Sequence, residues 1–392
     1  MKGFFFLLFF LCLHSFALSL DELIVKALEK NPSLESISHR ISASKSNTKL
    51  SNQFSNPSIS YAKNTLDDNQ AMSRSTVTLK QKLPYFGKRD NLKKIALANE
   101  SILYENLRQA KVNLVKEIKK QAYSVWELEN LYKIIDQYEN LTKQNIELFE
   151  SYTSTSDNQH MGIMSAGLTL SELRIQKSIL NEKIHSSYER LSYLSSFDVK
   201  DLNLNLFVKE LPDIQSLKGR FKNNPSIAIK EKEIKKSKAI LESKELDYYP
   251  DINLLGSYSH RENFDNFATF GLSLSLPIYG SERYKEESAR KLSLSAKSMR
   301  DDTKVLVDSK LTSTYFKMRS AYEIYHIVND EALPQIEHMF ELTSSLISTG
   351  GDLFKYIDIL VKKLKLEQKS ISAVANYNRA QANISAILGE MR

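Results

Sequence analysis

Few residues in this chain of 392 could carry out chemistry. It contains one cysteine, Cys12, and seven histidines, and no histidine pair has the His-Glu-x-x-His spacing of a zinc site. It also contains neither a glycine-rich phosphate loop nor a Gly-x-Ser-x-Gly nucleophile motif. The sequence therefore predicts no catalytic site and no cofactor, and it favours a transport or structural role over that of an enzyme.

One short segment carries side chains that could bind a soft metal ion. His160, Met161 and Met164 surround Gly162, which we place near the turn between two long helices. Imidazole and thioether ligands suit copper or silver ions. The alternative is that the tip of a helical hairpin tolerates many residue types. These three residues are therefore candidate ligands only, and the sequence assigns no metal to them.

Charge is mixed along the chain rather than collected in one patch. There are 54 Lys and Arg residues against 47 Asp and Glu residues, a net charge of +7. In stretches such as Glu231 to Lys238 the carboxylates alternate with lysines, as expected for a solvated helix face with i,i+4 pairs. Because nucleic-acid binding usually shows as a basic patch, we expect no nucleic-acid partner.

The first 17 residues are typical of a signal peptide. A basic start is followed by the apolar run Phe4 to Leu13, and Ser15 and Ala17 supply the small residues of a cleavage site. Cys12 lies inside the apolar run without the context of a lipoprotein signal, so we do not expect N-terminal lipidation. No later stretch reaches about 18 uninterrupted apolar residues. We therefore expect an exported protein that is periplasmic, secreted, or a barrel in the outer membrane.

The strongest pattern is an internal duplication. Three prolines and one glycine recur at a constant offset of 193 residues, and their neighbours agree as well. These repeat-defining turns are Pro32 with Pro225, Pro57 with Pro250, Pro84 with Pro277, and Gly87 with Gly280. Because chance rarely matches four breakers at one offset, we expect two tandem copies of one unit, residues 18–210 and 211–392.

Each repeat contains two segments with the alternation of a β-strand. Ala268 to Leu276 and Ile252 to Ser259 alternate apolar with small polar residues, with Leu255 as the exception, and weaker runs surround Tyr61 and Val77. Such a strand separates two environments, either a core or lipid on one side and water on the other. We expect strands of about 9–11 residues, the length of a tilted transmembrane strand.

Aromatic residues lie in or beside these strands. They are Tyr61, Tyr258, Phe264, Phe267 and Phe270. An aromatic girdle at a membrane interface and packing within a sheet core are both open interpretations.

Very long helices follow the strands. Neither Gly nor Pro occurs between Gly87 and Gly162, so a helix over residues 88–152 would extend ~98 Å at about 1.5 Å per residue. Apolar residues recur about every 3.5 residues within 353–374 and 173–194, which is the spacing of a coiled coil.

Two further segments complete the helical part. A second long helix over residues 282–348 contains Pro334, where we expect a kink. The segment 197–212 has alternating leucines and predicts a small sheet beside the helices.

Four transmembrane strands cannot close a barrel, because open edges in lipid leave backbone groups unpaired. Two chains would supply eight strands, a number whose interior is filled by side chains, whereas three would supply twelve and leave a channel. We therefore expect a mainly α chain with a small β part. If the strands are in a membrane, long antiparallel coiled-coil helices attached to the barrel would continue it as a periplasmic tunnel, and four strands per chain would complete a 12-stranded barrel in a trimer.

The order of elements resembles a known family. A helix, Asn-Pro, a strand pair, Leu-Pro-x-x-Gly and long helices, present twice, are similar to the TolC-type outer membrane efflux factors over essentially the whole mature chain. Leu83 to Arg89 resembles the version of the heavy-metal efflux branch. The resemblance implies a homotrimer in the cell outer membrane that contacts outer membrane lipid and extends into the periplasm. It would passively conduct substrates, such as drugs or metal ions, that an inner-membrane pump exports through a periplasmic adaptor protein.

The resemblance also implies a periplasmic gate. The turn at residues 348–351 should lie at the tip farthest from the barrel, and Tyr356 to Leu360 is similar to the aspartate-bearing segment of the tunnel constriction. Asp358 would then form a ring of three carboxylates that favours cations, unless Lys355 or Lys362 offsets its charge.

This chain departs from the family pattern at two gate positions. It has Val361 where a second acidic residue is common, and Asp352 where an arginine often follows the tip glycine. We therefore expect a less charged constriction built around Asp358, Asp352 and Lys355. The alternative is that Asp358 is an ordinary solvated carboxylate.

Two other functions fit an exported, helical chain without cysteine. A type I protein-secretion conduit would share the fold and differ in its partner and cargo. A trimeric coiled-coil adhesin or stalk would be held by a membrane barrel, but its strands would normally lie at one end of the chain. Here strand patterns occur in both repeats.

Overall fold

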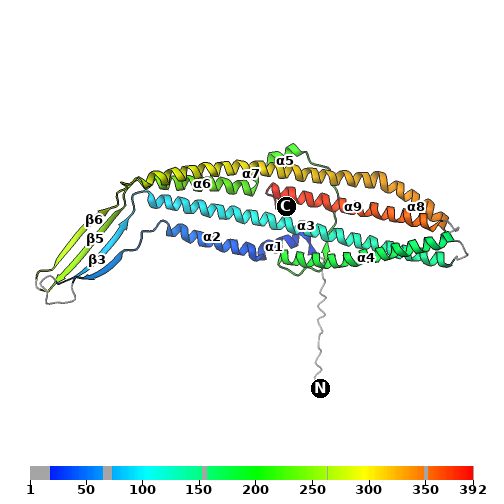
Figure 1. The fold of residues 1–392 in the computed structure, drawn as a ribbon, viewed down its shortest axis with the longest axis horizontal. Helices are drawn as coiled ribbons and strands as arrows, with labels where there is room; N and C mark the ends of the chain where they lie inside the picture. Colours follow the sequence, from blue (N-terminus) through cyan, green and yellow to red (C-terminus); the bar gives the residue numbers. More distant parts are fainter. Residues whose placement is uncertain (1–17, 65–72, 152–156, 263, 348–351, 392) are drawn as a thin grey trace, which may run out of the picture. The chain divides into compact units, whose positions relative to one another are not determined.

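The computed structural model describes residues 18–64, 73–151, 157–262, 264–347 and 352–391. The predicted signal peptide and the predicted tip at 348–351 lie outside these ranges. The described chain is mainly helical, with one four-stranded antiparallel sheet and one two-stranded parallel sheet (Figure 1).

The chain divides into two compact units, and each unit takes segments from both sequence repeats. Unit 1 comprises Met1–Pro32, Lys111–Lys218 and Leu311–Arg392, and unit 2 comprises Ser33–Ala110 and Gly219–Lys310. A compact unit is therefore not the same set of residues as a repeat.

Unit 2 contains the larger sheet and the helices that lead into and out of it. Its elements are α2 (Pro32–Leu50) from its second residue on, β2 (Ser58–Lys63), β3 (Arg74–Leu83), η1 (Phe221–Asn223), α6 (Pro225–Leu246), β5 (Ile252–Arg261) and β6 (Phe267–Leu274), with the first parts of α3 (Lys88–Ser151) and α7 (Ser281–His326).

The strands of unit 2 follow the order β2-β3-β5-β6, and every neighbouring pair is antiparallel. The central pairing joins the two repeats, since β3 and β5 are in register from Arg74 opposite Arg261 to Leu83 opposite Ile252 (Figure 1). Each repeat thus contributes one hairpin to a single sheet.

The expected strand length of about 9–11 residues holds for only half of the strands. The two central strands have 10 residues each, whereas β2 has 6 and β6 has 8. Within the described chain, each outer strand pairs with a neighbour on one side only. Strand β6 also ends at Leu274, ahead of Pro277, because proline has no N–H to donate to a sheet hydrogen bond. The prediction was therefore wrong for the two edge strands.

The repeated prolines and glycines occupy equivalent places in the two halves. Pro32 and Pro225 are the first residues of α2 and α6. Gly87 and Gly280 directly precede α3 and α7, and their φ angles are +87° and +73°. Because side chains disfavour this left-handed region, glycine suits the turn from strand to long helix.

Unit 1 contains the remaining helices and the small sheet. Its elements are β1 (Leu18–Ser19), α1 (Leu20–Lys30), the rest of α3, α4 (Asp157–Ser195), β4 (Leu202–Asn203), most of α5 (Ile214–Arg220), the end of α7, the π-helical segment η2 (Ile327–Ala332), α8 (Leu333–Ile347) and α9 (Leu353–Ile387).

The long helices begin and end close to the expected positions, with one difference in the second. Helix α3 has 64 residues from Lys88 to Ser151, as the absence of Gly and Pro predicts. The expected kink at Pro334 takes the form of the π-helical segment just before it, where Leu333 N–H donates to the carbonyl of Val328, five residues back. A wider turn accommodates a proline that lacks an N–H and crowds the carbonyl four residues earlier.

A small sheet is present within 197–212 as expected, but each of its two strands is only two residues long. Leu202 and Asn203 of β4 pair in parallel with Leu18 and Ser19 of β1. Ser19 also caps α1, since its hydroxyl accepts from the N–H of Glu22 at 3.3 Å and its own N–H donates to the Glu22 carboxylate at 3.1 Å.

Two hydrophobic clusters hold unit 1 together. One joins α1 to α3, to the end of α4 and to β4 through residues such as Leu23, Ile118 and Leu191, each fully buried. The other joins α3, α4 and α9, with Ile135, Leu173, Leu353, Ile357, Leu360 and Leu364 among its members. Apart from Ile135 of α3, these are positions that the 3.5-residue pattern selects. None of the described helices is long and apolar enough to cross a membrane.

Candidate functional site

The four-stranded sheet of unit 2 has one apolar and one polar face. In the observed register, Leu79 lies opposite Gly256 and Gly256 opposite Phe270, while on the other face Thr78 lies opposite Ser257 and Ser257 opposite Thr269. The apolar face is open, with Phe270 88% exposed. Its other exposed members are Ile59, Tyr61, Val77, Leu79, Ile252, Leu254, Tyr258, Leu272 and Leu274.

Leu255 interrupts the polar face, as the sequence indicates. It lies opposite Gly271, and a Cβ at that glycine would come within 3.7 Å of the Leu255 side chain. That distance is ordinary van der Waals contact, so Leu255 does not depend on this glycine. Phe267, opposite Ser259, is a second large apolar residue on this face.

The aromatic residues of the sheet are exposed in the single chain. Tyr61 donates or accepts a hydrogen bond with Ser75 at 3.0 Å. The guanidinium of Arg261 lies over the rings of Phe264 and Phe267, at 5.2 Å and 5.1 Å from the ring centres. With Phe264 53% exposed, these rings surround a cation at one end of the sheet rather than fill a core.

At the other end of the sheet, Asp251 ties the two repeats together. Its carboxylate accepts hydrogen bonds from the Lys88 ammonium at 2.8 Å and from the N–H of Tyr85 at 3.1 Å, and Lys82 lies at 3.1 Å. Burial raises the pKa of Asp251, but these donors outweigh it and lower the pKa to about 2. The rings of Tyr85 and Tyr249 stack beside this ion cluster, with centres 4.4 Å apart.

Sequence reasoning singled out the turn at Pro84 and Gly87 but missed Asp251. A signal was present in the repeat offset. The residues that correspond to Asp251 and Lys88 in the other repeat are Ser58 and Ser281, so one of two equivalent junctions carries a pair of opposite charges and the other carries none.

The start of α9 places the predicted gate residues on different sides of the helix. Asp352 caps the helix, and its carboxylate accepts from the N–H groups of Phe354 at 2.9 Å and Lys355 at 3.4 Å. Leu353 and Ile357 are buried in the cluster shared with α3 and α4.

Asp358 and Lys355 lie off that packed side and are exposed. Asp358 accepts a hydrogen bond from the Lys362 ammonium at 2.7 Å. The two side chains are 52% and 58% exposed, so solvent screens this pair. The carboxylate therefore carries its own compensating cation one helical turn away.

The candidate metal ligands do not lie in a turn. His160, Met161 and Met164 are exposed residues within the first turns of α4, which begins at Asp157, so the turn placement is corrected. Gly162 is buried there because its Cα faces α9, and a Cβ would come within 3.2 Å of the Cβ of Leu353. The described residues contain no group of three or more His, Cys, Asp and Glu side chains positioned to hold a metal ion.

Comparison with known proteins gives matches in structure alone. No family model and no curated protein matches the sequence. The open state of the MtrE outer membrane channel of Neisseria gonorrhoeae matches with a TM-score of 0.82 and 15% identity, over 95% of this chain and 89% of that one. The CmeC outer membrane channel of Campylobacter jejuni matches with a TM-score of 0.79 and 11% identity, over 94% of this chain and 85% of that one.

A third match is CusC, whose structures concern conformational changes that accompany folding and transmembrane channel formation. Its TM-score is 0.79 at 13% identity, over 95% of this chain and 92% of that one. The resemblance to TolC-type outer membrane efflux channels is therefore confirmed as a likeness of fold over nearly the whole chain.

Proposed function

We propose that this chain is one protomer of a homotrimeric outer membrane channel-tunnel, which passively conducts substrates exported by an inner-membrane pump through a periplasmic adaptor. The fold is that of outer membrane channels. Those matches are channel proteins, which favours conduction over catalysis. The observation that carries the proposal is the four-stranded sheet, whose apolar face is exposed.

The sheet has two edges, and both are formed by strands that pair on one side only within the described chain. Strand β2 pairs with β3, and β6 pairs with β5. In lipid, an unpaired edge costs several kcal/mol per backbone group, so β6 of one copy would pair with β2 of the next. Three copies would give twelve strands with lipid outside and a polar lumen inside.

The repeats predict the register of this pairing. Strand β6 corresponds to β3 and β2 to β5 at the 193-residue offset, and Lys80 lies opposite Leu255 in the observed β3–β5 pair. The equivalent residues are Ser273 and Ala62. We therefore place Ser273 of one copy opposite Ala62 of the next, both on the polar face.

The exposed aromatic residues fit the same arrangement. Phe264 lies between β5 and β6, and Tyr61 and Tyr258 are on the open apolar face. Residues of this kind form girdles at the interfaces of membrane barrels. In the proposed barrel they would contact outer membrane lipid.

Repeats 18–210 and 211–392 would act as two equivalent wall segments of the tunnel. The gate would lie at the start of α9, where three copies of Asp358 approach the axis with Lys362 beside each. Asp352 and Lys355 would shape the same constriction. The adhesin alternative is weaker because its strands would lie at one end of the chain, whereas this sheet takes a hairpin from each repeat.

A disulfide experiment tests the barrel directly. The chain has a single cysteine, Cys12, within the predicted signal peptide, so the mature chain offers a background without thiols. The variant with Ala62→Cys and Ser273→Cys should form disulfide-linked trimers in oxidised outer membranes. Its matched control, Ser60→Cys with Ser273→Cys, places both thiols on the same face but two residues out of register.

The control should yield little linked product on a non-reducing gel. Monomers alone with both variants would contradict the proposal. Equal linkage in both variants would contradict the register.

A further inference from the structure

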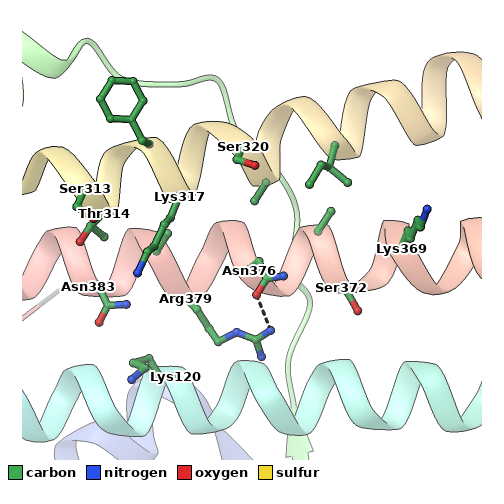
Figure 2. A pocket seen from close by; sticks show the side chains of 15 residues that line it. Lys120, Ser313, Thr314, Lys317, Ser320, Lys369, Ser372, Asn376, Arg379 and Asn383 are labelled. Carbon is green, nitrogen blue, oxygen red and sulfur yellow. Dashed lines mark hydrogen bonds between the residues drawn. The ribbon is translucent and has the colours of Figure 1, made fainter.

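A groove of about 1040 Å³ lies within unit 1, along α7 and α9 and beside α3 (Figure 2). Its lining combines cationic, neutral polar and apolar side chains. They are Lys120, Ser313, Thr314, Phe316, Lys317, Ser320, Ala321, Ile324, Lys369, Ser372, Ala373, Asn376, Arg379, Ala380 and Asn383.

Four of these fifteen residues are basic and none is acidic. Two of the four have their charge met by a carboxylate that does not line the groove. Arg379 lies 2.7 Å from the Glu127 carboxylate and also donates to Ser124 and Asn376. Lys120 lies 3.6 Å from Glu117. The charge of Arg379 is therefore compensated, whereas Lys120 is compensated only in part, because it shares Glu117 with Lys116 at 3.1 Å.

The other two cations are not compensated. Lys317 on α7 and Lys369 on α9 are exposed, and neither makes an ion pair or hydrogen bond with any described residue. Figure 2 shows Lys317 extending from α7 toward α9. Two uncompensated ammonium groups at a concave surface without carboxylates create a positive potential that attracts an anion.

The groove also offers apolar contact. Phe316 and Ile324 on α7 are 53% and 43% exposed, and the small residues Ala373 and Ala380 of α9 form part of the lining. An inorganic anion would leave this apolar surface unused. A ligand with a charged group and an apolar body would use both kinds of surface.

We propose that this groove binds an anionic amphipathic molecule, a carboxylate or sulfonate on an aromatic or alicyclic body. Lys317 would hold the anion, while Phe316 and Ile324 on the same helix would contact the body. Since Asn329 contacts Ser370 and Tyr322 lies beside Tyr377, Lys369 is ~20 Å from Lys317 along the helix pair, and it would add to the positive potential without touching the same charged group. The role of such a molecule as cargo rests on the proposed channel function, whereas its binding does not. The exposed side of α9 continues from the groove toward the proposed gate with Lys365, Lys362 and Lys355.

The test uses three probes that share one apolar body. They are 1-naphthalenesulfonate, the neutral 1-naphthalenemethanol and the cationic 1-naphthylmethylammonium. Binding to the full protein in non-ionic detergent is measured by equilibrium dialysis, with empty micelles subtracted. We expect saturable binding of the sulfonate at one site per chain, weaker binding of the alcohol, and no saturable binding of the ammonium probe.

Charge variants then locate the site. Lys317→Gln with Lys369→Gln should weaken sulfonate binding by about tenfold, through the loss of one direct charge contact at Lys317 and of the longer-range attraction of Lys369. The matched control is Lys291→Gln with Lys297→Gln, two exposed lysines of α7 outside the groove. It removes the same charge and should change the affinity less than about twofold.

A variant that binds the sulfonate more tightly than wild type would provide a control, because misfolding would not increase the affinity. Glu127→Gln removes the carboxylate partner of Arg379, so sulfonate binding should tighten. Phe316→Ala should weaken the sulfonate and the alcohol by a similar factor, because both share the apolar body.

Four results would overturn the proposal. Equal loss of binding in the groove and control variants would show that net charge alone attracts the probe. Equal affinity for the alcohol would remove the role of the anion, and full displacement by equimolar inorganic phosphate would remove the role of the apolar body. Binding seen only in dissociated monomers would show that a second copy covers the groove. The disulfide experiment reports on the channel proposal separately, since it involves no ligand.

Discussion

Asp251 and Lys88 form a 2.8 Å hydrogen-bonded ion pair between residues 163 positions apart, one from each repeat. Lys88 begins the long helix α3, and Asp251 precedes strand β5, so the pair fixes the end of the central β3–β5 pairing to the start of a helix. The Lys88 ammonium also donates to the carbonyl of Tyr249 at 2.7 Å. The junction is therefore a network rather than a single contact.

Asp251→Asn should destabilise the protein at neutral pH. The pKa of Asp251 is lowered from 3.8 to about 2, and its side chain is only 17% exposed, so the charged form contributes stability of about 2 kcal/mol. Because the folded pKa is the lower one, this contribution is present above about pH 4 and is lost as the pH falls toward 2.

The measurement is urea unfolding of wild type and Asp251→Asn in detergent between pH 2 and pH 7. The difference in unfolding midpoint should be largest at neutral pH and should close in acid. Asp302→Asn, which removes an exposed carboxylate of α7, controls for charge and should show no such difference. A difference in unfolding midpoint that stays constant with pH would show that the charge of the Asp251 carboxylate does not cause the difference in stability.

Gly87 should resist substitution for a backbone reason alone. Its φ is +87°, and a Cβ added there would meet no atom within 4 Å. Gly87→Ala should therefore cost about 1–2 kcal/mol of unfolding free energy without any steric clash. Gly87→Asn should cost less than Gly87→Val, because Asn tolerates the left-handed region. Thermal unfolding of the three variants gives the order, and equal losses would show that φ is not the constraint.

Two glycines of α4 should respond in opposite directions. A Cβ at Gly162 would lie 3.2 Å from Leu353, whereas a Cβ at Gly167 would meet nothing within 4 Å. Gly162→Val should therefore overpack the contact with α9 and cost about 1–3 kcal/mol. Gly167→Ala should stabilise the helix by about 0.5–1 kcal/mol, because glycine is a poor helix former. The unfolding midpoints of the two variants measure both effects. A Gly162→Val variant that is more stable than wild type would show that α9 can move away at no cost in free energy.

Sequence patterns predicted the features that depend on local chain chemistry. The absence of breakers after Gly87 placed the start of α3 at Lys88 and its end within one residue of Ser151. The 3.5-residue spacing within 353–374 predicted a packed side for α9, and Leu353, Ile357 and Leu360, which follow that spacing, are buried. Helix breakers indicate where a helix can begin and end, and periodicity indicates which of its sides packs. Neither prediction therefore needed knowledge of the partner helix.

The features that were missed depend on contacts between distant segments. Gly162 was taken as a sign of a turn, although it is a helical residue that lies close to Leu353 of α9. The Asp251–Lys88 pair and the uncompensated Lys317 and Lys369 follow from which helices and strands lie together. No spacing along one segment carries that information.

Ion selectivity should depend on the balance between Asp358 and Lys362, if three copies of α9 surround the proposed gate. The two side chains are paired at 2.7 Å and both are exposed, so each charge acts on the lumen while the other partly cancels it. Lys362→Gln should raise the preference of single channels for cations, and Asp358→Asn should lower it and weaken block by multivalent cations. The double variant should return near to wild type. Reversal potentials in planar bilayers under a salt gradient measure these shifts, with Lys183→Gln on α4 as the control for net charge. Unchanged selectivity and block in both single variants would remove this pair from the gate.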